Sequence, residues 1–583
     1  MGLYFSYFKT MIDADSVPDG LHRIMRDNIT EFPSTINTLK RFNLYPEVTL
    51  GLAYRCYQSL SDFFGYRTKQ CWQVNRGEGL SPVLSCEGLG EPSYFYTEAV
   101  FALNGLLLGL FFLFGTYLSG SLIGGITTAS CYIFNHGECT RVMWTSPLRE
   151  SFGYPFFVLQ MYLATIVLRN KSTEWKYSLM IAAAQIPFML SWQFAQFALL
   201  TQTLAIFGVY VLQLIPKSNF IIVISGQTVG LLISYVMLFG NAMLFTSFFA
   251  CALIAVWGLA ALEKTFKALH YRILIMLSQV ISFFTMLFLS KVVMGKLFHL
   301  EDDAHIAEIF RSKFSDFQNF HTMLYTCAKE FDFIETETLW KLLKTVLIPT
   351  ASVVLVFIIV QLVYHALQTL AFTAMALLIM RLKLFWTPQL CLMSSLVASR
   401  QLFGWGKKEI HFAVVAGLLA CMAFSGSANI KHELSILGEF SNYPQEELVE
   451  WINGKTPQDA VFAGSMPTMA TVKLCTQRPI VNHPHYEDAG LRERTKTVYT
   501  VYSRKPIEQV KTKLESLGVQ YLVLEDSWCR KRSRPGCSLP EIWDIEDSEN
   551  QGKQPVCIKM QKKPEPHFKT VFENVVYKVL KLT

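Results

Sequence analysis

The sequence predicts a polytopic α-helical membrane protein of about 12 spans with an α/β domain at its C-terminal end. Of its 583 residues, 51% are apolar and 17% are charged, whereas a soluble protein carries about 25% charged residues. Long uncharged runs lie between about 96 and 293 and between 345 and 424. The chain therefore divides into a first loop region (1–95), a transmembrane bundle (96–424) and a C-terminal domain (425–583).

Twelve apolar runs are candidates for membrane spans. A helix needs about 20 apolar residues to cross the hydrocarbon core, because each residue adds about 1.5 Å. Several runs are shorter, and we expect these to be tilted, broken or partly re-entrant. The runs are 97–117, 120–134, 154–168, 177–193, 195–215, 219–238, 242–261, 272–293, 345–363, 367–382, 387–402 and 411–424.

Basic residues in the loops indicate how the chain is oriented. The net charge of +7 is spread over short loops and is not gathered into one patch, so nucleic acid is not an expected partner. Cytosolic loops collect lysine and arginine, and the pattern places the first region and the C-terminal domain in the lumen. Arg381 and Lys383 fall on the wrong side of this pattern. The basic residues that fit are Arg169, Lys171, Lys176, Lys217, Lys264, Lys267, Arg272, Lys407 and Lys408. The luminal parts are then 1–95, 135–153, 294–343 and 425–583.

Most cysteines outside the apolar runs lie in the parts that we expect to be luminal, where disulfides can form. Cys71 and Cys86 are one candidate pair, and Cys529 and Cys537, which flank a Pro-Gly turn, are another. The alternative is free, packed cysteines. The sequon that begins at Asn28 is luminal in the same topology, so Asn28 is expected to be glycosylated.

The C-terminal region alternates strand-like and helix-like runs, which favours a small α/β domain. It contains no GxGxxG or P-loop motif, so nucleotide binding is not indicated. The expected strands are 459–464, 478–482 and 521–526, and the expected helices are 468–474 and 509–518.

The segment 135–150 follows the end of a predicted span on the luminal side. A lipid-linked donor carries its phosphate at the membrane surface, so the catalytic groups of an enzyme that uses it must lie in such loops. The segment contains Glu138, Arg141 and Arg149. Arginine suits a phosphate because its planar, permanently charged guanidinium donates paired hydrogen bonds. Arg141 and Arg149 are therefore candidate phosphate-binding residues, and the alternative is an interfacial loop whose arginines extend to lipid headgroups.

Two further segments, 300–314 and 482–495, hold candidate residues for a donor or acceptor pocket. The first carries an acidic cluster, which is typical of a divalent-cation site and equally of the first turn of a helix. The second contains a His-x-His pattern that suggests zinc, although no third ligand follows at a standard spacing. Its alternative is a surface turn that leads into a helix. The candidates, which include Glu138 of the preceding segment, are Glu138, Asp302, His305, His483, His485 and Glu487.

Specific motifs occur along nearly the whole chain, among them FNHGECTRVMW (134–144), SRQLFGW (399–405), RPIVNHPHYEDAGLRERT (478–495) and SWCRKRSRPGCSLPEIWD (527–544). They resemble the Dpy (dumpy) family of protein C-mannosyltransferases, and its vertebrate branch in particular. The resemblance implies a multispan fold shared with the catalytic subunit of oligosaccharyltransferase. It implies transfer of mannose from dolichyl-phosphate-mannose to the indole C2 of tryptophan in WxxW motifs. It implies no metal or other cofactor.

The resemblance also indicates two departures from the family. The family's catalytic carboxylate is a Glu directly before the segment that matches Met1-Gly2-Leu3-Tyr4, so we expect a chain truncated at its N-terminus with no catalytic residue of its own. The apolar run near 345–363 joins VYHALQ (363–368) more abruptly than the family pattern does.

Two interpretations of function remain at this point. The first is a C-mannosyltransferase of the endoplasmic reticulum membrane. Its partners would be membrane lipid, the lipid-linked donor, and acceptor proteins with thrombospondin type I repeats or WxxW motifs. The second is a non-catalytic membrane scaffold derived from the same fold, such as an anchoring protein of the inner nuclear membrane.

Overall fold

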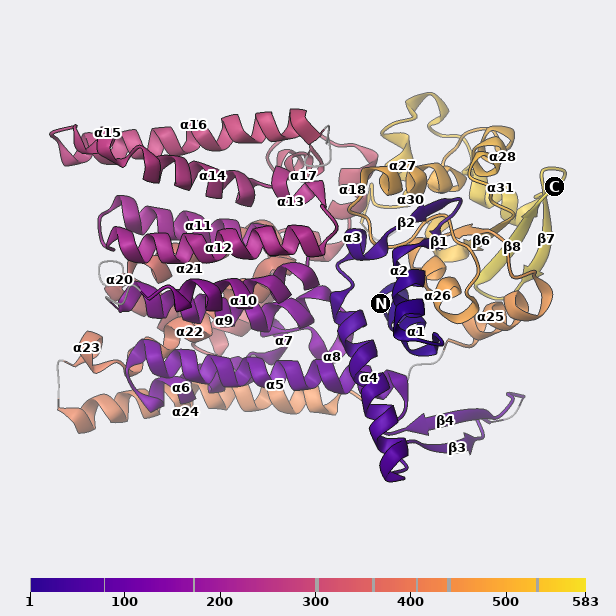
Figure 1. Cartoon of the computed structure of the whole chain (residues 1–583). Helices are drawn as coiled ribbons and strands as arrows, with labels where there is room; N and C mark the ends of the chain where they lie inside the picture. Colours follow the sequence, from indigo (N-terminus) through magenta and orange to yellow (C-terminus); the bar gives the residue numbers. More distant parts are fainter. Residues whose placement is uncertain are drawn as a thin grey trace. The chain divides into compact units, whose positions relative to one another are not determined.

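The chain separates into two compact units that combine distant parts of the sequence, and each is described by itself (Figure 1). They cut across the three regions expected from composition. The first unit consists of Met1–Leu60, Glu301–Phe331 and Gly438–Thr583, and the second of Ser61–Leu300 and Asp332–Leu437. The computed structural model describes residues 2–77, 79–170, 174–298, 304–358, 362–404, 407–437, 442–530 and 534–583.

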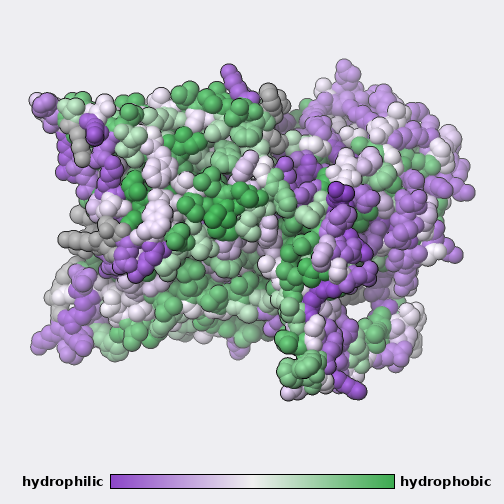
Figure 2. Space-filling view, in the orientation of Figure 1, coloured by the Kyte–Doolittle hydropathy of each residue, from purple (hydrophilic) through white to green (hydrophobic). Residues whose placement is uncertain are grey.

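The second unit is a bundle of apolar helices, and each of the apolar runs expected from the sequence overlaps one of them. Apolar side chains cover much of the visible surface of this unit (Figure 2). The helices are α5 (Pro92–Ser119), α6 (Leu122–Phe134), α9 (Arg149–Arg169), α10 (Lys176–Ser191), α11 (Ala195–Val211), α12 (Lys217–Met237), α14 (Phe248–Ala261), α16 (Arg272–Phe298), α20 (Leu347–Ile358), α21 (Val363–Leu378), α22 (Lys383–Ser394) and α24 (Lys408–Ser435).

Among the described residues, five helices are long and apolar enough to cross a bilayer, namely α5, α9, α12, α16 and α24. A sixth span results if α19 (Thr336–Lys344) and α20, which meet at an angle of 80°, form one broken span. Other apolar helices are shorter because polar residues interrupt the runs. Ser247 ends α13 (Ala242–Thr246), and its Oγ accepts a hydrogen bond from the backbone N–H of Ala250 at the start of α14. The protein is thus a multi-pass membrane protein, and the number twelve stays a prediction.

Short elements connect the bundle helices. A disulfide between Cys71 and Cys86 joins the paired strands β3 and β4, which confirms the first expected pair. The short elements of this unit are β3 (Gln70–Val74), β4 (Val83–Glu87), α7 (His136–Cys139), α8 (Val142–Thr145), α15 (Glu263–Lys267) and α23 (Arg400–Phe403).

The first unit contains a four-stranded sheet in the order β5-β6-β8-β7. Strand β5 (Phe462–Gly464) pairs in parallel with β6 (Tyr521–Glu525), and β6 pairs antiparallel with β8 (Tyr577–Leu582), which in turn pairs with β7 (Phe568–Glu573). The strands expected at 459–464 and 521–526 are confirmed, as are the two helices.

The strand expected at 478–482 is reduced to a single bridge between Phe462 and Ile480. The strand is this short because Ile480 also exchanges backbone hydrogen bonds with the N-terminal segment. Its N–H donates to the carbonyl of Ile29, and its carbonyl accepts from the N–H of Phe32.

Helices surround this sheet and join the N-terminal segment to it. Leu3, Tyr7 and Met11 of the first helix share one apolar cluster with Ala470 of α26. The remaining elements of this unit are α1 (Gly2–Asp13), α2 (Val17–Met25), β1 (Asp27–Glu31), β2 (Ser34–Ile36), α3 (Thr38–Phe42), α4 (Tyr45–Phe64, whose last turn belongs to the second unit), α17 (Ala304–Phe314), α18 (Phe320–Thr326), α25 (Tyr443–Lys455), α26 (Met466–Thr476), α27 (Ala489–Val498), α28 (Ile507–Ser516), α29 (Asp526–Cys529), α30 (Leu539–Asp544) and α31 (Val556–Lys562).

The second expected disulfide, between Cys529 and Cys537, is wrong. Cys529 pairs with Cys557 of α31, and Cys537 pairs with Cys327, which lies 210 residues earlier in the chain. A tight turn brings two cysteines near each other in sequence, but it does not decide the pairing when the fold supplies other partners.

We predict that peptide mapping without reduction will recover the linked pairs Cys71–Cys86, Cys327–Cys537 and Cys529–Cys557. Mass spectrometry of a digest of the full chain measures this directly. A linked Cys529–Cys537 peptide as the main species would contradict the observed packing of α30 and α31.

Candidate functional site

The described residues of the second unit form a pocket where α6 ends and α9 begins. The space between its walls, open solvent included, is about 390 Å³. Aromatic rings line one part of the wall, and a guanidinium and a carboxylate line another. The lining residues include Asn104, Tyr132, Arg141, Glu150, Tyr154 and Trp192.

The backbone after α6 places Arg141 at this pocket. Asn135 stops the helix, since its Nδ2 donates to the carbonyl of Cys131 (2.9 Å) and its Oδ1 accepts from Thr345 Oγ1 (2.7 Å). One helical turn, α7, follows, and Thr140 then adopts an extended conformation. Arg141 caps the next short helix, and its carbonyl accepts the N–H of Thr145. The guanidinium therefore extends from a short, hydrogen-bonded turn.

Glu150 lies between two guanidinium groups. Its Oε2 is 3.2 Å from Nη2 of Arg381, and its Oε1 is 3.9 Å from Nη1 of Arg141. The carboxylate is buried, whereas both arginine side chains are partly exposed. One carboxylate thus holds two guanidinium groups, of which that of Arg141 lines the pocket.

Glu138 forms a second cluster of the same kind. Its Oε2 accepts from Lys383 Nζ (2.5 Å) and from Thr338 Oγ1 (3.3 Å), and its Oε1 is 3.6 Å from Lys341 Nζ. Arg381 and Lys383, which break the charge pattern of the sequence, are therefore the partners of Glu150 in the first turn of α9 and of Glu138 in α7. They are functional candidates that the sequence analysis missed, and only their violation of the charge pattern indicated them.

Arg149 has a different environment. It is buried at the first residue of α9, its Nη2 donates to the carbonyl of Pro147 (3.3 Å), and its guanidinium lies 5.2 Å from the ring centroid of Phe152. It is not among the residues that line the pocket in the described part of the unit. The pocket therefore brings together Arg141 and Glu150, with Glu138 in the neighbouring turn, but not Arg149.

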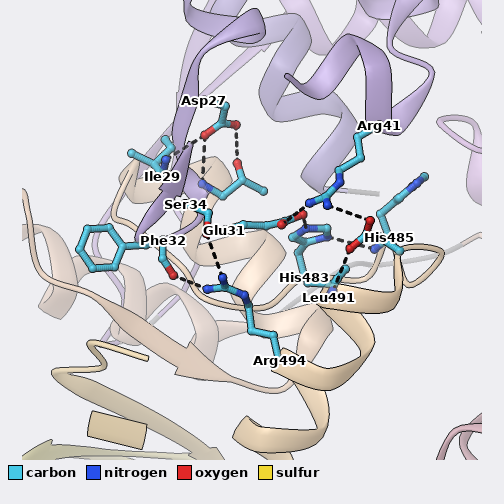
Figure 3. Close-up of polar contacts among 12 residues, drawn as sticks. Asp27, Ile29, Glu31, Phe32, Ser34, Arg41, His483, His485, Leu491 and Arg494 are labelled. Carbon is cyan, nitrogen blue, oxygen red and sulfur yellow. Dashed lines mark hydrogen bonds and ion pairs between the residues drawn. The ribbon is translucent and has the colours of Figure 1, made fainter. Parts of the chain in front are cut away.

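The first unit contains a buried cluster around Asp27, part of which Figure 3 shows. Its carboxylate accepts hydrogen bonds from Tyr7 Oη (2.6 Å), from Thr30 Oγ1 (2.5 Å) and from the backbone amides of Ile29 and Thr30. Lys473 Nζ lies 3.4 Å from Oδ2 of Asp27 and 3.4 Å from the ring centroid of Tyr7. This cluster fixes β1 and α1 to α26.

The two charges of this cluster stabilise each other. Burial alone would raise the pKa of Asp27, but the Lys473 ammonium and the hydrogen bonds from Thr30, Tyr7 and Ile29 outweigh it and lower the pKa. Burial lowers the pKa of Lys473 to about 8, and Asp27 opposes that shift. A buried ammonium of this kind depends on its carboxylate partner.

Glu31, Arg41 and His483 form a second polar cluster in this unit (Figure 3). Arg41 donates to Glu31 Oε2 and, at 2.8 Å, to Oδ2 of Asp488, while His483 Nε2 lies 3.1 Å from Oε1 of Glu31. Burial would raise the pKa of Glu31, but His483 and Arg41 together lower it. The acid of β1 is thereby tied to the turn before α27.

The hydrogen bonds of His483 define its tautomer. The backbone N–H of His485 donates to Nδ1 of His483, so Nδ1 carries no proton and Nε2–H donates to Glu31. Burial lowers the pKa of His483, and Glu31 only partly opposes this, so the ring is neutral. His485 Nδ1 lies 2.9 Å from Tyr4 Oη, and the carbonyl of Glu487 accepts from Arg492. These candidates join the N-terminal segment to the 478–495 segment.

The described residues contain no group of three or more His, Cys, Asp and Glu side chains arranged to hold a metal ion. Both ring nitrogens of His483 are used in hydrogen bonds. Asp302 lies outside the described residues, and so does the side chain of His305, whose backbone is in α17.

A protein-family model and several curated proteins match this sequence along nearly its whole length. The family model Dpy19, described as "Q-cell neuroblast polarisation", matches residues 1–363 and 358–582. The chain belongs to the Dpy19 family. The two matched segments meet at 358–363, in the region where the sequence analysis expects a departure from the family pattern.

Curated members of the Dpy19 family are similar over nearly the whole chain. The chain is 52% identical to human "Protein C-mannosyl-transferase DPY19L1" over 611 aligned residues, covering 100% of this chain and 90% of that protein. It is 42% identical to the Caenorhabditis elegans "C-mannosyltransferase dpy-19", covering 96% of this chain and 85% of that protein.

Solved structures confirm the expected fold of the Dpy19 chain. The oligosaccharyltransferase AglB of Archaeoglobus fulgidus, solved with an inhibitory peptide and a dolichol-phosphate, matches with a TM-score of 0.57 at 12% identity. The match covers 90% of this chain and 65% of AglB. A second structure of the A. fulgidus enzyme, with Zn and sulfate, gives a TM-score of 0.56 at 11% identity. At this identity the likeness shows the fold alone, a multispan membrane glycosyltransferase fold.

We predict that Asp27→Asn destabilises the first unit by about 3–5 kcal/mol, because it leaves the buried ammonium of Lys473 without its counter-charge. The double variant Asp27→Asn with Lys473→Met should be less destabilised, since both charges are then removed. Thermal unfolding of the full chain in nanodiscs measures both effects.

The matched control for this prediction is Asp19→Asn, which removes an ion pair between the partly exposed Asp19 and the exposed Arg23. Its effect should stay below about 1 kcal/mol. Equal losses in Asp27→Asn and Asp19→Asn would show that the buried cluster contributes no more than a surface pair.

We also predict that His483 makes stability depend on pH. Its pKa is lower in the folded chain than the ordinary value of 6.5, so below about pH 6.5 the unfolded chain binds a proton there that the folded chain does not. Stability therefore falls as the pH decreases, and His483→Gln should make this decline shallower. Unfolding midpoints across a pH series test this, with the exposed His22→Gln as the control that should retain the slope of the unaltered chain.

Proposed function

We propose that this protein is a protein C-mannosyltransferase of the endoplasmic reticulum membrane. It transfers mannose from dolichyl-phosphate-mannose to the indole C2 of tryptophan in WxxW motifs of acceptor proteins. The observation that carries the proposal is the 52% identity to human protein C-mannosyl-transferase DPY19L1 over the whole chain. The guanidinium of Arg141 on the pocket wall supports a donor that carries a phosphate.

The proposed reaction requires a cation at the leaving phosphate. The bond between the anomeric carbon and the phosphate oxygen breaks, and its electron pair stays on the phosphate. A carbon–carbon bond forms between the anomeric carbon and indole C2, and the C2 proton leaves to a general base. A fixed positive charge near the leaving oxygen lowers the barrier, because the phosphate gains negative charge as the bond breaks.

Arg141 is the residue that we propose for this role. Its side chain is partly exposed at the pocket, and its contact with Glu150 is long, at 3.9 Å. Arg141 therefore places a permanent positive charge on the pocket wall, where an anionic oxygen of the donor can meet it. Arg381, held by the other oxygen of Glu150, is proposed to add to the positive field and to keep Glu150 from neutralising Arg141.

The proposed activity predicts addition of one hexose to a WxxW peptide. Microsomes come from cells whose own C-mannosyltransferases have been removed, and dolichyl-phosphate-mannose is the donor. The chain is tested as it stands and joined to the part of human DPY19L1 that lies outside the aligned region, because the alignment covers 90% of that protein. Mass spectrometry should locate the hexose on tryptophan, and a peptide with Trp→Phe should stay unmodified. No product from the joined protein would overturn the proposal.

The matched variants are made in the active form of that assay. Arg141→Ala should lower turnover by about 100-fold, the usual cost of removing one group that stabilises a developing negative charge. Arg400→Ala, which removes an exposed arginine of α23, is the control and should retain activity. Undiminished turnover in Arg141→Ala would reject this residue as the phosphate ligand while leaving the overall activity in place.

A further inference from the structure

The last turn of α4 ends in an exposed apolar patch that the functions described above do not use. Phe63, Phe64 and Tyr66 are 80%, 63% and 71% exposed, and Leu60, one turn earlier on the same helix face, is also exposed. These four residues are called the helix-end patch. Large aromatic side chains gathered at one exposed place mark an interaction surface.

The helix-end patch has a fixed shape. Gly65 adopts a left-handed conformation (φ 69°), and its N–H donates to the carbonyl of Asp62. The N–H of Tyr66 donates to the carbonyl of Ser61, which completes a Schellman motif and turns the chain back over the helix end. The ring centroids of Phe63 and Phe64 lie 5.1 Å apart, and those of Phe64 and Tyr66 lie 6.3 Å apart. The rings are therefore held together by the backbone and by one another.

The chain directly after the helix-end patch is bound to the start of α5. The N–H of Gly90 donates to the carbonyl of Thr68 (3.0 Å), and Lys69 Nζ lies 2.7 Å from Oε2 of Glu91. A Cβ on Gly90 would lie 2.9 Å from the Cβ of Lys69, so the two segments pack closely. Because Glu91 immediately precedes α5, the patch is only a few residues from the point where this helix begins.

The position of α5 in the bilayer determines how deep the start of this helix lies. The helix is 28 residues long, is among the helices able to span a bilayer, and exposes apolar side chains such as Phe101, Leu106 and Leu113 along its length. Its 28 residues exceed the about 20 that the hydrocarbon core needs, and its uncharged stretch begins after Glu98, within about two turns of its first residue. The helix-end patch is consequently held near the boundary between headgroups and acyl chains.

We propose that the helix-end patch inserts into the headgroup–acyl boundary of the membrane that α5 crosses. Tyrosine is enriched at this boundary, and interfacial helices bury apolar faces that contain phenylalanine and leucine about 5–10 Å into it. The exposed Arg67 follows the patch and suits anionic headgroups. The loop before α5 thereby gains a second attachment to the bilayer, independent of the transferase activity.

The experiment places an environment-sensitive fluorescent amino acid at Phe64 of the full chain in nanodiscs of phosphatidylcholine and phosphatidylserine. The matched control has the same probe at Val575, an exposed apolar residue in the turn between β7 and β8. We expect the probe at position 64 to be quenched by lipids with brominated acyl chains and to lose quenching by aqueous iodide. The probe at position 575 should behave in the opposite way.

A second measurement tests the same contact without the bulky fluorescent amino acid. Benzoylphenylalanine, which resembles phenylalanine in shape, replaces Phe63, and illumination should crosslink it to lipid. Iodide quenching at position 64 equal to that at position 575 would overturn the proposal. So would protection from iodide without bromolipid quenching, or crosslinking of position 63 to protein alone, because either result would indicate a protein partner in place of the bilayer.

Discussion

The charged end of the helical unit depends on two buried carboxylates, Glu138 and Glu150. Each holds two cations that come from other parts of the chain. A charge that is removed from water needs a partner, because its desolvation otherwise costs several kcal/mol. The acids of α7 and of the first turn of α9 therefore draw the start of α22 and the helix α19 to the same place. The pocket is lined by residues of the segment after α6, of the first turns of α9 and of the start of α22.

In the first unit, buried carboxylates likewise join the N-terminal segment to the C-terminal domain through polar partners. Asp27 with Lys473, and Glu31 with His483, connect β1 to α26 and to the 478–495 segment. In the sequence, the His-x-His motif suggests zinc. In the structure, both ring nitrogens of His483 form hydrogen bonds within the protein. The role of His483 is therefore structural, because its neutral ring links the backbone amide of His485 to the carboxylate of Glu31.

Local patterns predicted local structure well, and long-range partners could not be read from them. The strand β6 and the helix α28 follow from apolar runs and periodicity, and each apolar run overlaps a helix of the described residues. The pairing of Cys537 with Cys327 joins residues 210 positions apart, and nothing in the spacing encodes it. Arg381 looked like an error in topology because its partner, Glu150, lies on another helix. A charge that violates a topological pattern is thus informative about tertiary pairing.

The interior of the bundle explains how such a pocket can keep its shape. Apolar contacts between helices in lipid select packing only weakly, since lipid tails are equally apolar. Three glutamines on neighbouring helices provide a stricter requirement. Gln202 donates to Gln160 Oε1 (2.7 Å), and Gln227 donates to Gln202 Oε1 (2.8 Å). Sliding one helix past another would break this chain of buried amides, and an amide without a partner in hydrocarbon is costly. The amides therefore fix the register of α9, α11 and α12, and with it the position of the end of α9 that carries Glu150.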